Sequence, residues 1–301
     1  MRRAPFTSPA CPLPPADLAR CFMTHQKSQF SEDLLLLPTL MLPFPESSKT
    51  FQHGGLINRA RHRRGSFVEI GAFDGVNKSN TFAFERCCGW LGALIEANPS
   101  NFEALQRSGR RSSMIHSGVC PSPGRFNMSS EGGLFAAAVV NGQHASRIEL
   151  RRKKVSVSCD TLERLLDSGM PDEVRGREID FLSLDVEGLE EMVLSTIDPT
   201  RFKVIVMESQ KVKRSALDRI RRRMAQRGML EVPGLRVHNS KVFAHANFSV
   251  VVVPNVRYWP PPPKMPDEAG LADGLRKALH KITSYSRSSE GPSITFTIRS
   301  L

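Results

Sequence analysis

Three acidic side chains lie where a strand would pass into a loop or a helix, the usual place for chemistry in enzymes built on open sheets. Asp185 and Glu208 each end a short apolar run, and Glu187 opens a helix-like stretch. The carboxyl ends of parallel strands meet at one edge of a sheet, so these side chains should converge. A carboxylate there can take the proton of an attacking hydroxyl group. We therefore expect Asp185 to be a general base, with Glu187 and Glu208 as its catalytic neighbours.

Glu187 allows two interpretations. It could hold the substrate or share a divalent metal ion, whose charge would lower the pKa of a bound hydroxyl group. An acid in the first turn of a helix is also favoured by the helix dipole, without any catalytic role. The sequence favours neither interpretation.

A second set of residues indicates the ligand. Phe67 to Gly75 has the pattern of a buried strand with a glycine-bearing turn, and Gly92 to Glu96 that of a second strand ending in an acid. Gly71 and Gly75 let the backbone approach a ligand. Glu96 is placed to accept hydrogen bonds from both hydroxyls of a ribose. The order of the two strands favours an adenosine-type ligand over an ordinary turn and a solvated strand end.

The spacing narrows the class of ligand. A dinucleotide site needs glycines in the pattern G-x-G-x-x-G, whereas Gly71 and Gly75 are separated by three residues and the third glycine is absent. The carboxylates of Glu69 and Asp74 would repel a pyrophosphate but suit an ammonium and a sulfonium. S-adenosylmethionine therefore fits better than NAD. An NAD(P)-dependent oxidoreductase is the weaker alternative.

These stretches resemble the FkbM-type methyltransferase family. The resemblance covers roughly Gly65 to Val253 and is most specific from Ile179 to Gly188. It implies a class I S-adenosylmethionine-dependent methyltransferase that acts on a hydroxyl of a sugar or natural product. The chain departs from the family in having Glu69 where aspartate is commoner, and its last strands, around Val237 to Val253, are only loosely similar. The other segments that carry the resemblance are Ser79-Asn80-Thr81 with Glu85, Gly89 to Pro99, Asn101-Phe102, Cys159 to Leu162 and Val204 to Glu208.

The resemblance and the strand ends together define an expected donor site and an expected acceptor. The acceptor would be a small molecule or glycan that offers a hydroxyl group. The donor-binding residues would be Glu69, Gly71, Ala72, Asp74, Gly75, Asn80, Glu96, Asn98 and Ser117.

The sequence predicts an α/β fold with a doubly wound, mostly parallel sheet. Short apolar runs without alternation are typical of parallel strands buried on both faces. The predicted strands are Phe67 to Gly71, Gly92 to Glu96, Ser113 to Ser117, Ile179 to Asp185 and Val204 to Glu208. The predicted helices are Ser79 to Arg86, Asn101 to Ser108, Thr161 to Asp167, Gly188 to Ser195 and Ser215 to Arg227. An insertion from Phe126 to Val157 precedes an extra strand at Val155 to Cys159.

We expect a catalytic domain at residues 66–253 between two extensions, of which residues 1–65 should be poorly ordered. Residues 1–65 are rich in proline and arginine, and prolines at 9, 12, 14 and 15 should break any early helix. Their basic start is compatible with an organelle-targeting peptide. The apolar run from Leu34 to Phe44 is too short to span a membrane. Residues 254–301 are rich in proline and serine and should be extended or disordered.

The net charge of +12 invites a nucleic-acid interpretation. Much of the excess lies in Arg147 to Lys154 and Lys211 to Arg227, and the second run carries Leu217, Ile220 and Met224 at helical spacing. A solvated face on a surface helix explains that run, and aromatic residues for base stacking are few. Nucleic acid is therefore disfavoured as a partner. A non-catalytic binding module that uses its basic face is the alternative from another class.

The cysteines show neither paired C-x-x-C spacing nor a compact secreted framework. Adjacent Cys87 and Cys88 cannot easily bridge each other, and no zinc site is evident. We therefore expect free thiols in a reducing compartment, most simply the cytoplasm. The remaining cysteines are Cys11, Cys21, Cys120 and Cys159.

Overall fold

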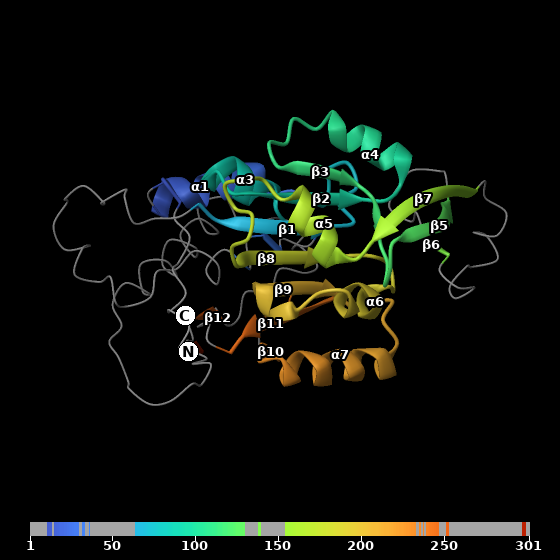
Figure 1. Ribbon diagram of the computed structural model, residues 1–301. Coiled ribbons are helices and arrows are strands. Elements are labelled where there is room, and N and C mark those ends of the chain that lie inside the picture. Colours follow the sequence, from blue (N-terminus) through green and yellow to red (C-terminus); the bar gives the residue numbers. More distant parts are fainter. Residues whose placement is uncertain are drawn as a thin grey trace, which may run out of the picture.

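A seven-stranded sheet forms the centre of the computed structural model (Figure 1). The structure describes residues 11–13, 15–29, 32–33, 36, 64–129, 138–139, 154–232, 235, 237, 239–246, 251–252 and 297–298. In spatial order the strands are β3 (Ser113–His116), β2 (Leu91–Glu96), β1 (Ser66–Ile70), β8 (Ile179–Leu184), β9 (Phe202–Glu208), β11 (Ser240–His245) and β10 (Met229–Glu231).

All neighbouring pairs from β3 to β9 are parallel, whereas β11 is antiparallel to both β9 and β10. The order along the chain reverses between β1 and β8, because β1 leads outward to β2 while β8 leads outward to β9. Such a reversal leaves a crevice at the carboxyl ends of the two central strands, where ligands bind in this class of sheet. The expected doubly wound α/β fold is confirmed.

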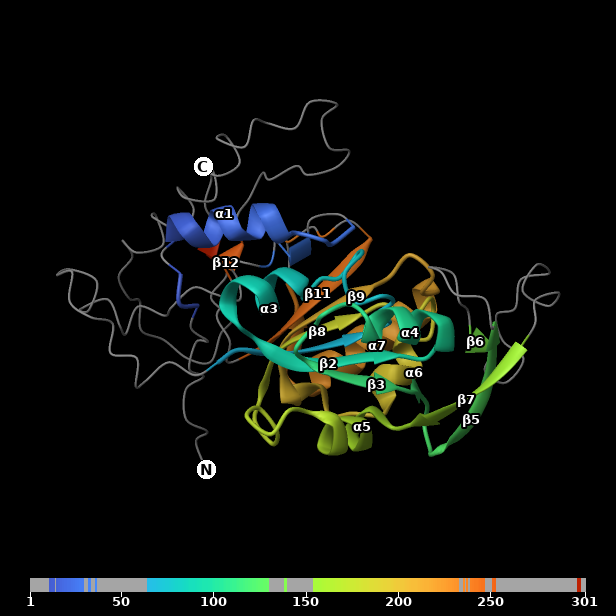
Figure 2. The ribbon, with the colours of Figure 1, turned by 90° about the horizontal axis from the view of Figure 1, so that it is seen from above.

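Helices cover both faces of the sheet (Figure 2). One apolar cluster joins Phe67 of β1 to α1 (Pro15–His25), α3 (Phe82–Cys88) and α4 (Pro99–Gln106). The other joins Val68 of β1 to α5 (Leu162–Gly169), α6 (Glu190–Ser195) and α7 (Arg214–Gln226). Successive residues of a strand point to opposite faces, so β1 is buried by both layers.

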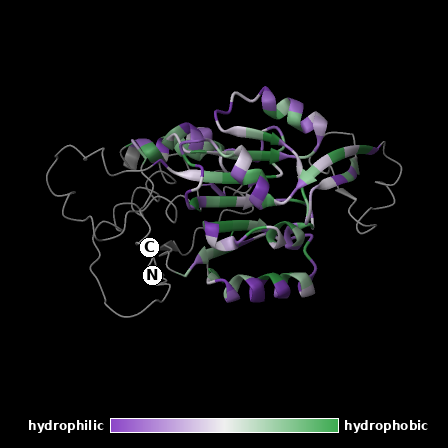
Figure 3. Ribbon diagram, in the orientation of Figure 1, coloured by the Kyte–Doolittle hydropathy of each residue, from purple (hydrophilic) through white to green (hydrophobic). Residues whose placement is uncertain are grey.

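Helix α7 has the face that the sequence predicted. Ile220 and Met224 are buried in the core, and Leu217 packs against it. The outer side is hydrophilic (Figure 3). Two of its arginines form ion pairs with Glu191 and Glu231, so part of the basic run is neutralised within the protein.

The region before β1 contains a helix where none was expected. Pro15 is the first residue of α1, a position at which proline is tolerated because its missing N–H has no helical partner. Phe22 is fully buried, and its ring meets that of Phe84 edge to face at 4.9 Å. The early prolines therefore precede or begin a helix that packs on the core.

Disulfides correct the expectation of free thiols. Cys11 bonds to Cys88, and Cys21 to Cys87, so both neighbours at the end of α3 are used to fix the α1 segment. None of the six cysteines is free. The partners are 77 and 66 residues apart along the chain, and a search for local C-x-x-C spacing cannot find such pairs.

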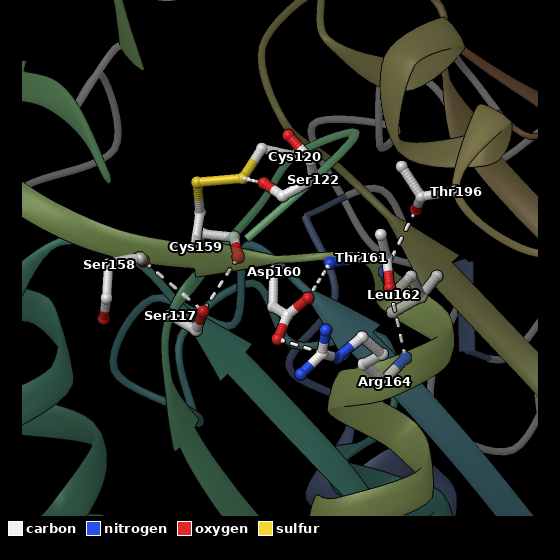
Figure 4. The surroundings of a disulfide bond; sticks show 11 residues. Ser117, Cys120, Ser122, Ser158, Cys159, Asp160, Thr161, Leu162, Arg164 and Thr196 are labelled. Atoms are coloured by element: carbon white, nitrogen blue, oxygen red, sulfur yellow. Dashed lines mark hydrogen bonds and ion pairs between the residues drawn. A yellow bond between two sulfur atoms is a disulfide. The ribbon is translucent and has the colours of Figure 1, made fainter. Parts of the chain in front are cut away.

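The third disulfide, Cys120–Cys159, lies in a small second sheet (Figure 4). That sheet has the order β4 (Gly118–Val119), β7 (Lys154–Asp160), β5 (Gly124–Ser129) and β6 (Ala138–Val139), and it follows directly from the end of β3. The predicted extra strand is part of β7. Beside the disulfide, Asp160 pairs with Arg164 at 3.3 Å.

Several boundaries differ from the sequence prediction. Helix α3 begins at Phe82 rather than Ser79, because Ser79 to Thr81 still belong to the loop after β1. Strands β3 and β8 end one residue early, so Ser117 and Asp185 follow their strands. A 3-10 turn, η4 (Pro199–Arg201), precedes β9.

Some predictions lie largely outside the described residues. These are the Leu34 to Phe44 run, most of the insertion and most of the C-terminal extension, of which only the short β12 (Val251–Val252) and β13 (Thr297–Ile298) pair is described. Among the described helices, none combines the length and apolar character that a membrane crossing requires.

The disulfides can be tested by alkylation. Protein denatured without reductant should take up no thiol reagent on its cysteines, because all six are paired. After reduction all of them should react, and mass spectrometry counts the adducts. Adducts before reduction would restore the free-thiol expectation.

Candidate active site

The loop after β1 is held in an unusual backbone conformation. Gly71 has φ +81°, and a Cβ atom there would collide with the carbonyl oxygen of Asp185. Phe73 and Lys78 also have positive φ, at 52° and 64°, which non-glycine residues seldom adopt. Such conformations persist where the surroundings fix them, and they cluster at functional sites.

Two carboxylates that we expected at the donor site accept hydrogen bonds from this loop. Asp74 accepts backbone hydrogen bonds from Val76 at 2.9 Å and from Asn77 at 2.7 Å. Glu69, which is buried, accepts from the backbone N–H of Asn80 at 2.8 Å and from the Thr81 hydroxyl at 2.6 Å. The Ser79 hydroxyl donates to the same carboxylate at 2.7 Å.

Arg110 carries the positive charge beneath the loop. Its side chain is fully buried and lies 3.1 Å from Glu85 and 3.9 Å from Glu69. It also donates to the carbonyl oxygen of Gly75 at 2.6 Å and to the Thr81 hydroxyl at 2.9 Å. A buried charge is tolerated only with such partners, so this network ties the loop to the core.

Glu96 reaches the loop from the end of β2. Its carboxylate accepts the backbone N–H groups of Phe73 at 2.8 Å and Asn98 at 2.7 Å. Burial raises the pKa of Glu96, although these hydrogen bonds oppose the rise. The Asn101 side chain and the Ala97 backbone also donate to Glu96, so this carboxylate joins the end of β2 to the loop and to the start of α4.

Three other residues expected at the donor site, Asn98, Ala72 and Ser117, contact neighbouring parts of the protein. The Asn98 side chain is fully buried and caps α4, accepting from Ser100 at 2.9 Å and Asn101 at 3.2 Å. Ala72 packs in the core. Ser117 lies beside the small sheet, and its hydroxyl donates to the carbonyl oxygen of Gly118 at 2.9 Å (Figure 4).

A small cleft opens at the carboxyl ends of β8 and β9. Asp185 and Glu208 line it together with Lys78 and Asn80 from the loop after β1. Asn80 donates to the Ser183 hydroxyl at 2.9 Å, while its buried Oδ1 has no hydrogen-bond partner. The cleft therefore joins the expected donor loop to the expected catalytic acids.

The acids of the cleft hold their protons more tightly than ordinary carboxyls. Asp185 can be reached from the cleft, yet the protein packed around it raises its pKa to about 7, and Glu208 and Glu187 add to the rise. Burial and the charge of Glu187 likewise raise the pKa of Glu208. A carboxyl group with a pKa near neutrality is suited to accept a proton at neutral pH.

Glu187 and Glu190 differ in their partners. Glu187 has φ +59° and forms an ion pair with Lys211. Glu190 is fully buried at the start of α6, where it accepts the backbone N–H groups of Val186 and Gly188, each at 3.2 Å. Burial raises the pKa of Glu190 to about 7.

The segment after α1 forms another wall of the cleft. Gln29 and Glu32 line it, and Ser28 forms a bridge to Lys78 of the loop after β1. The disulfides of α1 thus fix a segment that borders the candidate active site.

Glu190, Arg110 and this N-terminal wall were not predicted from the sequence. Glu190 resembles any acid in the first turn of a helix, and Arg110 lies in an ordinary basic stretch before β3. Only the position of Glu190, close after Asp185, was a usable signal. The N-terminal wall depends on contacts between distant parts of the chain.

The fold and the site together define an enzyme class. An order-reversed parallel sheet with a glycine loop, an acid at the end of the second strand and an acidic cleft at the reversal point is the arrangement of a nucleotide-type ligand site in an α/β enzyme. Residues 69–230 match the family model described as the methyltransferase FkbM domain. The chain therefore belongs to the FkbM methyltransferase family and contains its methyltransferase domain.

Solved structures of methyltransferases show weaker similarities. Methyltransferase FkbM from Methylobacillus flagellatus KT is 14% identical, with a TM-score of 0.38, over 76% of this chain and 60% of that chain. Precorrin-6y C5,15-methyltransferase from Geobacter metallireducens GS-15 is 13% identical, with a TM-score of 0.32, over 61% and 80%. The human methyltransferase 10 domain containing protein is 11% identical, with a TM-score of 0.34, over 77% and 95%. No curated protein matched.

The Arg110 network predicts a large stability loss. Arg110→Met leaves Glu69 and Glu85 buried without their counter-charge, so it should lower the free energy of unfolding by about 3–5 kcal/mol in urea titrations. Arg107→Met, at an exposed position near the end of α4, is the matched control and should change little. Equal stabilities of the two variants would show that the network does not hold the loop.

Proposed function

We propose that the protein transfers a methyl group from S-adenosylmethionine to a hydroxyl group of a small molecule or glycan. The observation that carries this proposal is the contact between the two halves of the site. Gly71 of the donor loop lies against the backbone of Asp185, and the Asp185 N–H donates to the Ile70 carbonyl oxygen at 3.1 Å. A donor bound at the loop would therefore have the acidic cleft beside it.

The residues of the loop fit S-adenosylmethionine. Glu96 lies at the carboxyl end of β2 and borders the loop, where a ribose would meet its carboxylate, and the partnerless Oδ1 of Asn80 is an acceptor for an ammonium group. When bound, the cofactor supplies an electrophilic methyl group. Glu69 acts as a positioning residue, since its carboxylate is engaged by the loop itself.

Asp185 prepares the acceptor. It lies at the cleft with a pKa of about 7, so it can accept the proton that the hydroxyl group loses as its oxygen attacks. Glu208 lies beside it and keeps that pKa high. The polar side chains of Gln29, Glu32 and Asn239 line the same cleft and are suited to bind a hydroxylated acceptor.

Two alternatives make different predictions. A non-catalytic binding module would bind neither S-adenosylmethionine nor its product. An NAD(P)-dependent oxidoreductase would need a loop that accepts a pyrophosphate, whereas the buried carboxylates of Glu69 and Glu96 border this loop. The matched methyltransferase domain favours methyl transfer over both.

The disulfides also indicate the kind of cellular compartment in which the protein folds. The expectation of a cytoplasmic protein rested on free thiols, and that premise does not hold. Structural disulfides persist in oxidising surroundings. We therefore infer that the protein folds in an oxidising compartment, such as the lumen of a secretory organelle, rather than in the cytoplasm.

Glu96→Ala tests the donor site. The variant loses two charge-assisted hydrogen bonds to the ribose, so binding of S-adenosylhomocysteine should weaken by roughly 2–4 kcal/mol in calorimetry. Glu103→Ala, on the exposed side of α4, should bind like the wild type. Unchanged affinity of Glu96→Ala would remove Glu96 from the site.

Asp185→Asn tests the acceptor side. The substitution keeps the shape but removes proton acceptance, so turnover should fall by about a hundredfold or more, while S-adenosylhomocysteine still binds. Release of S-adenosylhomocysteine across a panel of glycans and small alcohols is the assay, with Asp172→Asn, an exposed position, as the control. Wild-type turnover by Asp185→Asn would exclude Asp185 from the reaction.

A further inference from the structure

Three carboxylates come together beside the cleft from separate elements. Asp185 follows β8, Glu190 begins α6 and Glu208 ends β9. Each offers an oxygen atom, and these atoms all lie within 4.8 Å of one another. We propose that this acid triad binds a divalent cation of the oxygen-preferring kind, such as Mg²⁺, Mn²⁺ or Ca²⁺.

The proximity of acids alone would not establish a site, but Glu190 adds an independent observation. Its side chain has no exposed surface. One oxygen accepts two backbone N–H groups, whereas Oε2 is buried without a hydrogen-bond partner. Oε2 of Glu208 is likewise buried and partnerless. Buried acceptors without partners are costly, and a cation between them would supply the missing interaction.

The positive side chains nearby do not balance the triad. Lys211 forms its ion pair with Glu187, a fourth acid. Lys78 and Glu32 both line the cleft, so there are two lysines for five carboxylates. The excess negative charge favours a small cation of high charge.

The spacing of the oxygens suits hard cations. Two ligands on opposite sides of an ion lie about 4.8 Å apart at a Ca–O distance of about 2.4 Å, and closer for Mg²⁺. Carboxylates are ligands that Mg²⁺, Mn²⁺ and Ca²⁺ prefer over softer donors. Asp185 opens to the cleft, which leaves coordination positions for water or a substrate oxygen.

This inference rests on the proposed methyl transfer and deepens it. A cation held beside Asp185 would bind the acceptor hydroxyl and lower its pKa. Asp185 would then also hold the ion next to the acceptor oxygen that attacks the methyl group. Acceptors with two adjacent hydroxyls, which can bind the ion through both, would be favoured.

The test is direct cation binding by the full-length protein. After dialysis against a chelator, the protein should bind one Mn²⁺ per chain in calorimetry. The electron paramagnetic resonance signal of free Mn²⁺ should decrease by the same amount when protein is added. Glu190→Gln should weaken this binding by about tenfold or more. Glu191→Gln is the matched control, because Glu191 carries the same charge on the next residue but forms a surface ion pair with Arg219.

Glu190 also accepts backbone hydrogen bonds, so its replacement changes the local structure as well as the cation site. Glu208→Gln therefore serves as a second variant and should likewise weaken Mn²⁺ binding. Melting curves show whether both variants are folded. Absence of saturable Mn²⁺, Mg²⁺ or Ca²⁺ binding by the wild type would overturn the cation site, as would equal affinities of Glu190→Gln and Glu191→Gln. S-adenosylhomocysteine binding is measured on the same samples. Donor binding without cation binding would reject only the cation, whereas loss of both would reject the proposed function as well.

Discussion

The parallel pairing of β1 with β8 is the interaction on which the site depends. It places Leu184 opposite Ile70, and the backbone of Asp185 continues the pairing by donating to the Ile70 carbonyl oxygen. Gly71 then approaches the Asp185 carbonyl so closely that no side chain fits. The proposed donor loop and Asp185, the proposed base, are thus neighbours through backbone contacts.

Buried charges on either side of this pairing have different consequences. Beneath the loop, Arg110 offsets Glu69 and Glu85 and each carboxylate has several donors, so the network fixes a strained backbone. At the cleft, Asp185, Glu190 and Glu208 crowd together with raised pKa values, and Glu190 and Glu208 each have a buried oxygen without a hydrogen-bond partner. The first arrangement is satisfied within the protein, whereas the second is poised to interact with a proton, a substrate or a cation.

Sequence reasoning was most successful where the signal is local. The apolar strands, the glycine turn and the acids at strand ends follow from residue patterns, and the α/β fold and family are confirmed. It failed where distant segments meet. The pairing of Cys21 with Cys87, the wall formed by Gln29 and Glu32, and the counter-charge of Arg110 all join residues far apart along the chain. The side chain of Glu69 shows the same limit, because its acidic character was evident but its direction was not.

Binding of the methyl donor by the wild-type protein tests the central claim most directly. Calorimetric titration of the full chain with S-adenosylmethionine, S-adenosylhomocysteine and NAD separates the enzyme classes without knowledge of the acceptor. The structure predicts one site per chain for S-adenosylmethionine and S-adenosylhomocysteine, and no binding of NAD. Failure to bind either sulfur compound, or saturable binding of NAD in their place, would contradict the account.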